Sequence, residues 1–264
     1  MNKRTGFTLM ELLVVIAIVA LLTSILVPAL NKAKATTKDL LCTSRLRELG
    51  SIWKMYTDDN DGRFMKRGCG SSRGAVTWFH SIRSYYSNPE LLVCPLAVKT
   101  HQEGGRNPYM AWDDITDFGV YYRGSYGINL WVSNGAGIGA IECPDSVGEN
   151  FESWCWRTPS VKGASYAPLV LCSQWKDIQP YPWDSPPQHE WDIWTSGPTN
   201  EMRRVCIKRH SPYHVKVLFL DFSVGKRTIK EVWRLRWHKE WPPDYPLPVW
   251  EVEAPWMADV PEPD

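Results

Sequence analysis

Apolar residues run almost without a break from Phe7 to Val27, and Glu11 carries the one charged side chain inside this run. About 20 consecutive apolar residues are enough for a helix to cross a lipid bilayer. A carboxylate at the centre of such a helix costs roughly 2.5–3.5 kcal/mol, so an intramembrane Glu marks a functional position by default. Glu11 follows Phe7 by four residues, which places both on one helix face.

Beyond Pro28 the pattern changes from continuous to periodic. Apolar residues recur there at spacings of three and four, which predicts an amphipathic helix over residues 28–57 with one face docked on a domain. Pro28 should kink the helix, because proline lacks an N–H and clashes with the preceding turn. A helix of about 50 residues would be ~75 Å long. The predicted docking face consists of Leu40, Leu41, Leu46, Leu49, Trp53 and Tyr56.

The pattern of residues 58–240 predicts a globular head with short strands and long loops. We expect a short helix over residues 77–87, strands over residues 125–132 and 168–172, and a long surface loop over residues 176–200. The clearest strand starts at His214, where apolar and polar residues alternate, and a turn near Asp221–Gly225 allows a return strand. Residues 241–264 are rich in Pro and acidic residues and should form a flexible tail.

The amino-acid composition narrows the range of possible functions. The formal net charge is +1, so no basic field suggests a nucleic-acid partner. The unusual numbers are 15 Trp and 20 Pro, which suit a loop-rich β domain with aromatic clusters. Core packing is the commoner use of Trp, although its flat face also stacks on sugars, which makes a glycan a candidate ligand.

The start of the chain resembles a known class of signal. Lys3 and Arg4 form a basic head, and residues 6–11 read Gly-Phe-Thr-Leu-Met-Glu. This closely resembles the class III signal peptide of type IV prepilins and type II secretion pseudopilins. The resemblance implies that a prepilin peptidase cleaves between Gly6 and Phe7 and N-methylates Phe7, and that Glu11 assists entry into a filament. A cleaved secretory signal would end at a small-residue site after the apolar run, and a simple anchor would not explain Glu11.

The same resemblance implies an α+β, type IV pilin-like lollipop. Residues 1–6 would be the leader and residues 7–27 the transmembrane part of a long helix packed on a loop-rich antiparallel β-sheet head. The protein would be a non-enzymatic subunit of a type II secretion pseudopilus or type IV pilus, without a cofactor. It would sit in the bacterial inner membrane as a single-pass protein with a periplasmic head. Its partners would be the peptidase, other pilin or pseudopilin subunits and an inner-membrane assembly platform. The alternative is a minor pilin-like surface module whose Trp-rich head contacts a glycan or substrate.

A second resemblance covers the C-terminal part. It is to a pseudopilin-like family whose signature is Arg-His, nine residues, then Asp-Gly. Arg209-His210 and Asp221 match, but ten residues separate His210 from Asp221 and Phe222 replaces the glycine. The resemblance implies fold and filament class but no activity. His210 with Asp221 could be an acid/base pair, and a hydrogen bond that ties a hairpin is the favoured interpretation.

The cysteines are expected to form disulfides. Six of the seven lie beyond the helix, and disulfides persist in an oxidising compartment such as the one a prepilin head would face. None of them forms a Cys-x-x-Cys pair, so no zinc site is expected. His210 and His214 have i,i+4 spacing, but Pro212 lies between them and a strand follows, so no metal site is expected there either. The seven are Cys42, Cys69, Cys94, Cys143, Cys155, Cys172 and Cys206.

Overall fold

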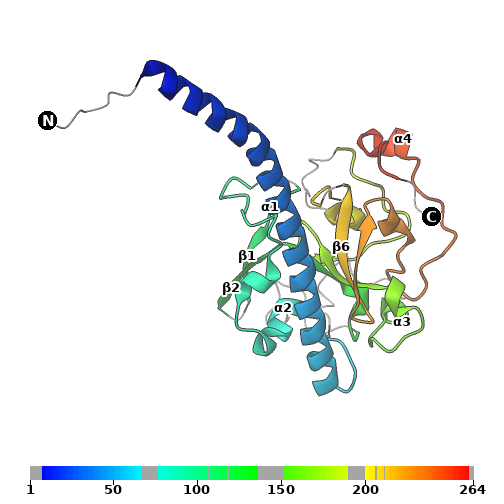
Figure 1. The fold of residues 1–264 in the computed structure, drawn as a ribbon. Helices are drawn as coiled ribbons and strands as arrows, with labels where there is room; N and C mark the ends of the chain where they lie inside the picture. Colours follow the sequence, from blue (N-terminus) through cyan, green and yellow to red (C-terminus); the bar gives the residue numbers. More distant parts are fainter. Residues whose placement is uncertain are drawn as a thin grey trace. The chain divides into compact units, whose positions relative to one another are not determined.

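The computed structural model describes residues 8–66, 77–105, 108–117, 119–135, 151–189, 200–205, 207–210 and 212–261. The chain divides into two compact units, residues 1–40 and residues 41–264, which are described separately. The described part of the first unit is helical, and the second unit contains the end of that helix together with the sheets (Figure 1).

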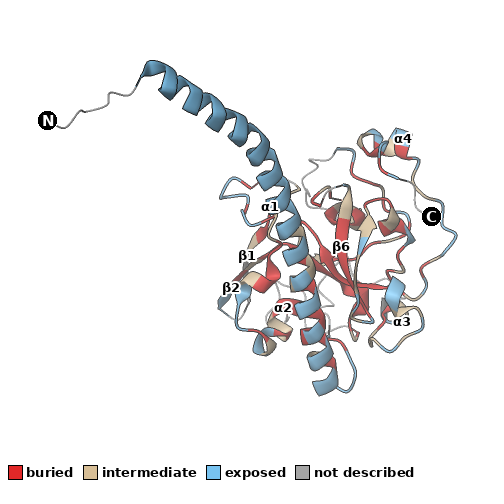
Figure 2. Cartoon of the chain, viewed as in Figure 1, coloured by how far each residue is buried: buried red, intermediate tan, exposed pale blue. Residues whose placement is uncertain are grey.

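Helix α1 runs from Leu9 to Asp59 and continues through Pro28. Over residues 8–38 every side chain is exposed, including the whole described part of the apolar run (Figure 2). This segment is long and apolar enough to cross a membrane. An apolar surface of this size on all sides of a helix needs lipid or other helices around it.

The last third of α1 packs into the second unit with one face. Its buried residues recur at spacings of one, three and four, as an amphipathic helix requires. The predicted face is wrong at two positions: Leu40 is 63% exposed and Leu41 44% exposed. Cys42 takes their place, because it lies one turn before Leu46 on the same side of the helix. The buried residues are Cys42, Leu46, Leu49, Gly50, Ile52, Trp53 and Thr57.

A five-stranded mixed sheet forms the centre of the second unit, in the order β5-β3-β4-β6-β7. β3 pairs in parallel with β5, and the other neighbours are antiparallel. The strands are β3 (Tyr126–Asn129), β4 (Pro168–Cys172), β5 (Asp177–Ile178), β6 (His214–Phe219) and β7 (Val224–Thr228). β3 and β4 are buried along their whole length, and β4 accordingly has an unbroken apolar sequence.

A separate antiparallel hairpin and several single-turn helices accompany this sheet. The hairpin joins β1 (Trp112–Asp117) and β2 (Val120–Gly124). The short α-helices are α2 (Trp78–Ser81), α3 (Phe151–Trp154) and α4 (Trp250–Glu253). The 3₁₀ turns are η1 (Arg83–Tyr85), η2 (Pro89–Leu92), η3 (Leu130–Val132), η5 (Ala164–Tyr166), η6 (Glu201–Arg204), η7 (Glu231–Arg234) and η8 (Pro255–Met257). A long N-terminal helix followed by a β-sheet head confirms the predicted α+β fold.

Aromatic side chains fill much of the core. Trp53 stacks on Trp78 with ring centroids 6.5 Å apart, and Trp131 and Trp154 pack against the ring of His238. Nine tryptophans are buried among the described residues: Trp53, Trp78, Trp112, Trp131, Trp156, Trp233, Trp237, Trp241 and Trp250. Trp183, by contrast, is 59% exposed. The tryptophans therefore serve packing first.

The C-terminal segment differs from the flexible tail that its composition predicts. Trp250 is 4% exposed, Met257 0% and Val260 2%, and all three belong to the same core as the sheet. The prolines and acidic residues of this segment lie between these apolar residues, so the composition averaged over the segment conceals the anchoring positions.

Candidate functional site

Two groups of residues bear on function, and the first is the start of α1. The predicted cleavage site at Gly6 and Phe7 lies outside the described residues. Thr8 and Glu11 are described, and they form a reciprocal pair at the first turn. The backbone N–H and hydroxyl of Thr8 donate to Glu11 Oε2 at 2.9 and 2.8 Å, and the Glu11 N–H donates to Thr8 Oγ1 at 3.2 Å.

This pairing is a capping box, in which residues Ncap and N3 satisfy each other's unpaired backbone N–H groups. Glu11 therefore has a local structural partner in addition to the assembly role that the sequence resemblance implies. The cap stabilises the first turn, and the carboxylate also lies at the positive end of the helix dipole. The capping role and the assembly role of Glu11 can be separated by substitution. Gln can form the same capping box as Glu, but it has no charge with which to pair in a filament.

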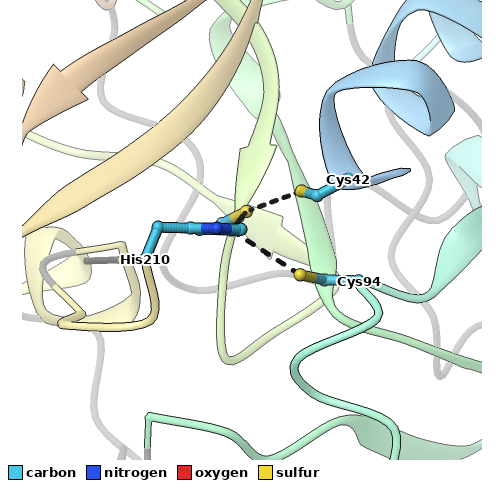
Figure 3. Close-up of side chains that lie close together, drawn as sticks. Cys42, Cys94 and His210 are labelled. Atoms are coloured by element: carbon cyan, nitrogen blue, oxygen red, sulfur yellow. Dashed lines mark hydrogen bonds between the residues drawn. The ribbon is translucent and has the colours of Figure 1, made fainter. Parts of the chain in front are cut away.

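The second group is a buried cluster of three cysteines and one histidine. Cys42 lies on α1, Cys94 follows η2, Cys172 ends β4, and His210 precedes β6. The Cys42, Cys94 and His210 side chains point toward one another (Figure 3). Four segments far apart in the sequence thus each supply one residue, and all four side chains are buried.

The distances within the cluster are short. Cys42 Sγ lies 3.7 Å from Cys172 Sγ, and His210 Nε2 lies 3.3 Å from Cys172 Sγ and 3.6 Å from Cys94 Sγ. One ligand atom from each of the four residues falls within 4.8 Å of the others. Sulfur and imidazole nitrogen are the atoms that soft and borderline metal ions prefer in proteins.

A shell of hydrogen bonds fixes the cluster. The Tyr126 hydroxyl donates to Cys42 Sγ at 3.3 Å, and the backbone N–H of Cys94 donates to the Ser125 hydroxyl. The guanidinium of Arg209, which is 1% exposed, donates to four backbone carbonyls: Pro108 at 2.8 Å, Ser125 at 2.7 Å, Met110 at 3.2 Å and Ser173 at 3.0 Å. These bonds hold the backbone beside His210 against the backbone beside Cys172.

The four residues also affect one another's protonation. Burial raises the pKa of the Cys42 thiol well above its usual range. For Cys172, burial acts in the same direction, but hydrogen bonds to the Cys42 and Cys94 thiols and the charge of His210 lower the pKa well below its usual range. Burial would lower the pKa of His210, but the neighbouring cysteines raise it to about 10. Cys172 therefore becomes a thiolate more readily than Cys42 does.

The cluster changes two expectations drawn from the sequence. The described cysteines of the cluster, Cys42, Cys94 and Cys172, are free thiols, and Cys69, Cys143 and Cys206 lie outside the described residues. The lack of a Cys-x-x-Cys pair argues against a metal site only when the ligands are local, and here the fold assembles them from distant segments. The position of Cys42 on the long helix separates it from the other cysteines in the sequence, yet it shares the buried face with Leu46 and Leu49.

The partners of the His210 side chain also differ from the one expected from the sequence, which was Asp221. Asp221 accepts hydrogen bonds from the backbone N–H and hydroxyl of Ser223 at 3.0 and 2.6 Å, whereas the His210 ring lies against sulfur atoms. His214 donates its backbone N–H to the carbonyl of His210 at 3.0 Å and pairs with it in an isolated antiparallel bridge. His210 is thus joined to the start of the hairpin through backbone atoms. Its imidazole contacts the cysteines of the cluster instead of Asp221.

Comparison with known proteins defines the class of the N-terminal segment. Residues 1–27 match the family model described as the prokaryotic N-terminal methylation motif. The chain therefore carries a prepilin-type N-terminus, which confirms the resemblance drawn from residues 1–30.

A particular relative is similar over a longer stretch. A 61-residue segment, 23% of this chain, is 41% identical to the type IV wide pilus major component PilA4 of Thermus thermophilus. The match covers 47% of PilA4, so the chain spans about half the length of the curated relative it matches. No solved structure matches the chain. These comparisons support a pilin-like structural protein.

Proposed function

We propose that this protein is a pilin-like filament subunit. Prepilin peptidase cleaves it between Gly6 and Phe7 and methylates Phe7, and residues 7–27 anchor it in the bacterial inner membrane with the head in the periplasm. It then joins other pilin or pseudopilin subunits, through the assembly platform, in a type IV pilus or a type II secretion pseudopilus. The observation that carries this proposal is the prepilin-type motif over residues 1–27 together with the full exposure of the apolar part of α1 that it includes.

The physical argument concerns what can surround this helix. The exposed residues include Leu12, Leu13, Val14 and Val15, which are consecutive and therefore lie on different sides of α1. Lipid satisfies such a surface before assembly, and neighbouring copies of the same helix satisfy it in a filament. Cleavage after Gly6 would create a free amine at Phe7, which is the natural partner for the Glu11 carboxylate of an adjacent subunit.

The burial of most described tryptophans weakens the alternative hypothesis of a Trp-rich head that binds a glycan or substrate. Most described tryptophans are buried, so they present no ring face to a sugar. Tyr181 and Trp183 do stack with ring centroids 4.9 Å apart, and Trp183 is exposed. Tyr181 is half-buried, and one exposed ring is ordinary for a surface, so we assign the head no ligand and no catalytic residue.

Three substitutions separate assembly from helix capping. Glu11→Ala removes both the charge and the cap, Glu11→Gln removes only the charge, and Thr8→Val removes only the cap. Intact-mass analysis first establishes that each variant is cleaved and methylated. Sheared surface filaments are then quantified by immunoblotting in a strain that lacks the wild-type gene.

If charge pairing drives assembly, both Glu11 variants enter filaments at least about tenfold less than wild type, whereas Thr8→Val assembles normally. Loss of the cap alone weakens the first turn by only about 0.5–2 kcal/mol. Normal assembly of Glu11→Gln would show that Glu11 acts as a cap and would overturn the pairing. Absence of the protein from all filaments, with the wild type correctly processed, would overturn the proposed function itself.

A further inference from the structure

The geometry of the buried cluster points to a metal site: we propose that Cys42, Cys94, Cys172 and His210 bind one Zn²⁺ ion. The site would be a closed, structural one with four protein ligands. It lies in the head, and it is independent of the processing and assembly proposed above.

The separations within the cluster fit a tetrahedral ion. Zinc binds sulfur at about 2.3 Å and imidazole nitrogen at about 2.0–2.1 Å, so its ligand atoms lie about 3.8 Å apart for two sulfurs and about 3.5 Å for sulfur and nitrogen. The observed Cys42–Cys172 distance is 3.7 Å, and the two sulfur–nitrogen distances are 3.3 and 3.6 Å. The cluster already has the size of a zinc coordination shell.

A disulfide fits these positions less well. Two bonded sulfur atoms lie about 2.05 Å apart, whereas Cys42 and Cys172 are separated by 3.7 Å. A disulfide between them would also leave the Cys94 thiol and the His210 ring without a role at the same point. The three thiols and one imidazole, taken together, are the donor set of a Cys₃His zinc site.

Burial distinguishes a structural site from a catalytic one. Cys42, Cys94 and Cys172 are 0% exposed and His210 is 1% exposed. Catalytic zinc keeps one coordination position open to water or substrate, whereas structural zinc takes all four ligands from protein. Four buried ligands leave no open position here.

The charges around the cluster also suit the ion. Binding of Zn²⁺ to three thiols and a neutral imidazole releases three protons to solvent and leaves the site with one net negative charge. Arg209 is buried directly beside His210 in the sequence, and its guanidinium donates to four carbonyl oxygens. A buried charge is costly without an opposite one, and the anionic zinc–thiolate centre would supply an opposite charge.

Hydrogen bonds from neighbouring residues hold the four proposed ligands in place, as in known zinc sites. Outer-shell hydrogen bonds orient ligands and tune their basicity. The Tyr126 hydroxyl donates to Cys42 Sγ, and Arg209 fixes the backbone next to two of the ligands. The ion would thereby join α1, the segment after η2, β4 and the segment before β6 at one point of the core.

Metal analysis of the full-length protein tests this proposal. The protein is produced with added zinc, purified in detergent under reducing conditions, and analysed by inductively coupled plasma mass spectrometry. The wild type should hold about one zinc per chain, and Cys94→Ser and Cys172→Ser should hold at least tenfold less. Cys155→Ser is the matched control, because Cys155 is equally buried but its Sγ lies 3.8 Å from the Ser133 hydroxyl, outside the cluster.

Measurements on the wild type alone keep the proposal testable if the variants do not fold. Exchange of Zn²⁺ for Co²⁺ should give the visible spectrum of a tetrahedral thiolate site, and chelation should lower the melting temperature by at least about 10 °C. A folded wild type without zinc would overturn the proposal, as would a Cys42–Cys172 disulfide found by peptide mapping. Full zinc occupancy in Cys172→Ser would overturn it as well.

Discussion

Gly50 marks a close approach of α1 to the sheet, and a larger side chain there should weaken the head. A Cβ atom at this position would lie 3.0 Å from Leu218 Cδ1 and 3.2 Å from the carbonyl oxygen of Phe222. The Leu218 side chain can adjust, but the Phe222 oxygen belongs to backbone. Phe222 has a φ of 65° and donates its N–H to the carbonyl of Phe219 at 3.0 Å, so this turn is fixed.

Two opposing effects decide the outcome. Replacing Gly by Ala inside a helix contributes about 1 kcal/mol of intrinsic helix stability. Crowding of a packed contact costs about 1–3 kcal/mol. Gly50→Ala should therefore lower the unfolding free energy by about 0–2 kcal/mol. Gly50→Val adds two methyl groups to the same contact and should destabilise the head by about 2 kcal/mol, or about 4–8 °C in melting temperature.

Urea unfolding of the full chain in detergent, followed by tryptophan fluorescence, measures the effect because Trp53 lies on the same buried face of α1. Ser51→Ala and Ser51→Val are the matched controls, since Ser51 is the next residue of the helix and is exposed. They report helix propensity without the contact. If Gly50→Val is as stable as Ser51→Val, the close approach has no energetic weight and the reasoning fails.

Three further predictions concern processing, independence of the head and pH. Gly6→Val should block cleavage and Gly6→Ala should be mild, because the peptidase needs a small residue; N-terminal mass analysis that finds a mature Gly6→Val protein would contradict this. A fragment of residues 31–264 should be soluble and unfold cooperatively, because the core begins at Cys42; aggregation on size-exclusion chromatography would count against it. Burial raises the pKa of Asp184 to about 6 from its ordinary 3.8, so the stability it contributes is present below pH 4 and is lost as the pH rises through 6. Asp184→Asn should remove on the order of 2–3 kcal/mol of that decline in pH-dependent unfolding, and an unchanged pH profile would refute the assignment.

The elements that the sequence predicts well are those with strong, local patterns. The long helix, the strand at residues 168–172 and the hairpin that starts at His214 all follow from continuous or alternating apolar residues. The prepilin motif is local as well, since it occupies consecutive residues. Such signals depend on neighbours in the sequence, and they are readable without knowledge of the tertiary fold.

The Cys/His cluster could not be predicted in this way, because its four residues share no spacing. Cys42 and Cys172 are 130 residues apart, and Cys94 and His210 are 116 apart. Arg209 matches the signature of the second family resemblance, but its role could not be predicted, since that role depends on four carbonyls brought together by the fold. The one available hint is that Cys42 falls one turn before Leu46 on the buried face of α1.

The anchoring of residues 250–260 in the core has a consequence for biogenesis. The same hydrophobic core contains Cys42 and Val260, so it joins residues from both ends of the head's sequence. Contacts of such large sequence separation form late and slowly during folding. The head therefore cannot complete its core until residue 260 has left the ribosome, by which time the proposed membrane helix has long been synthesised. The chain would be tethered before it is folded.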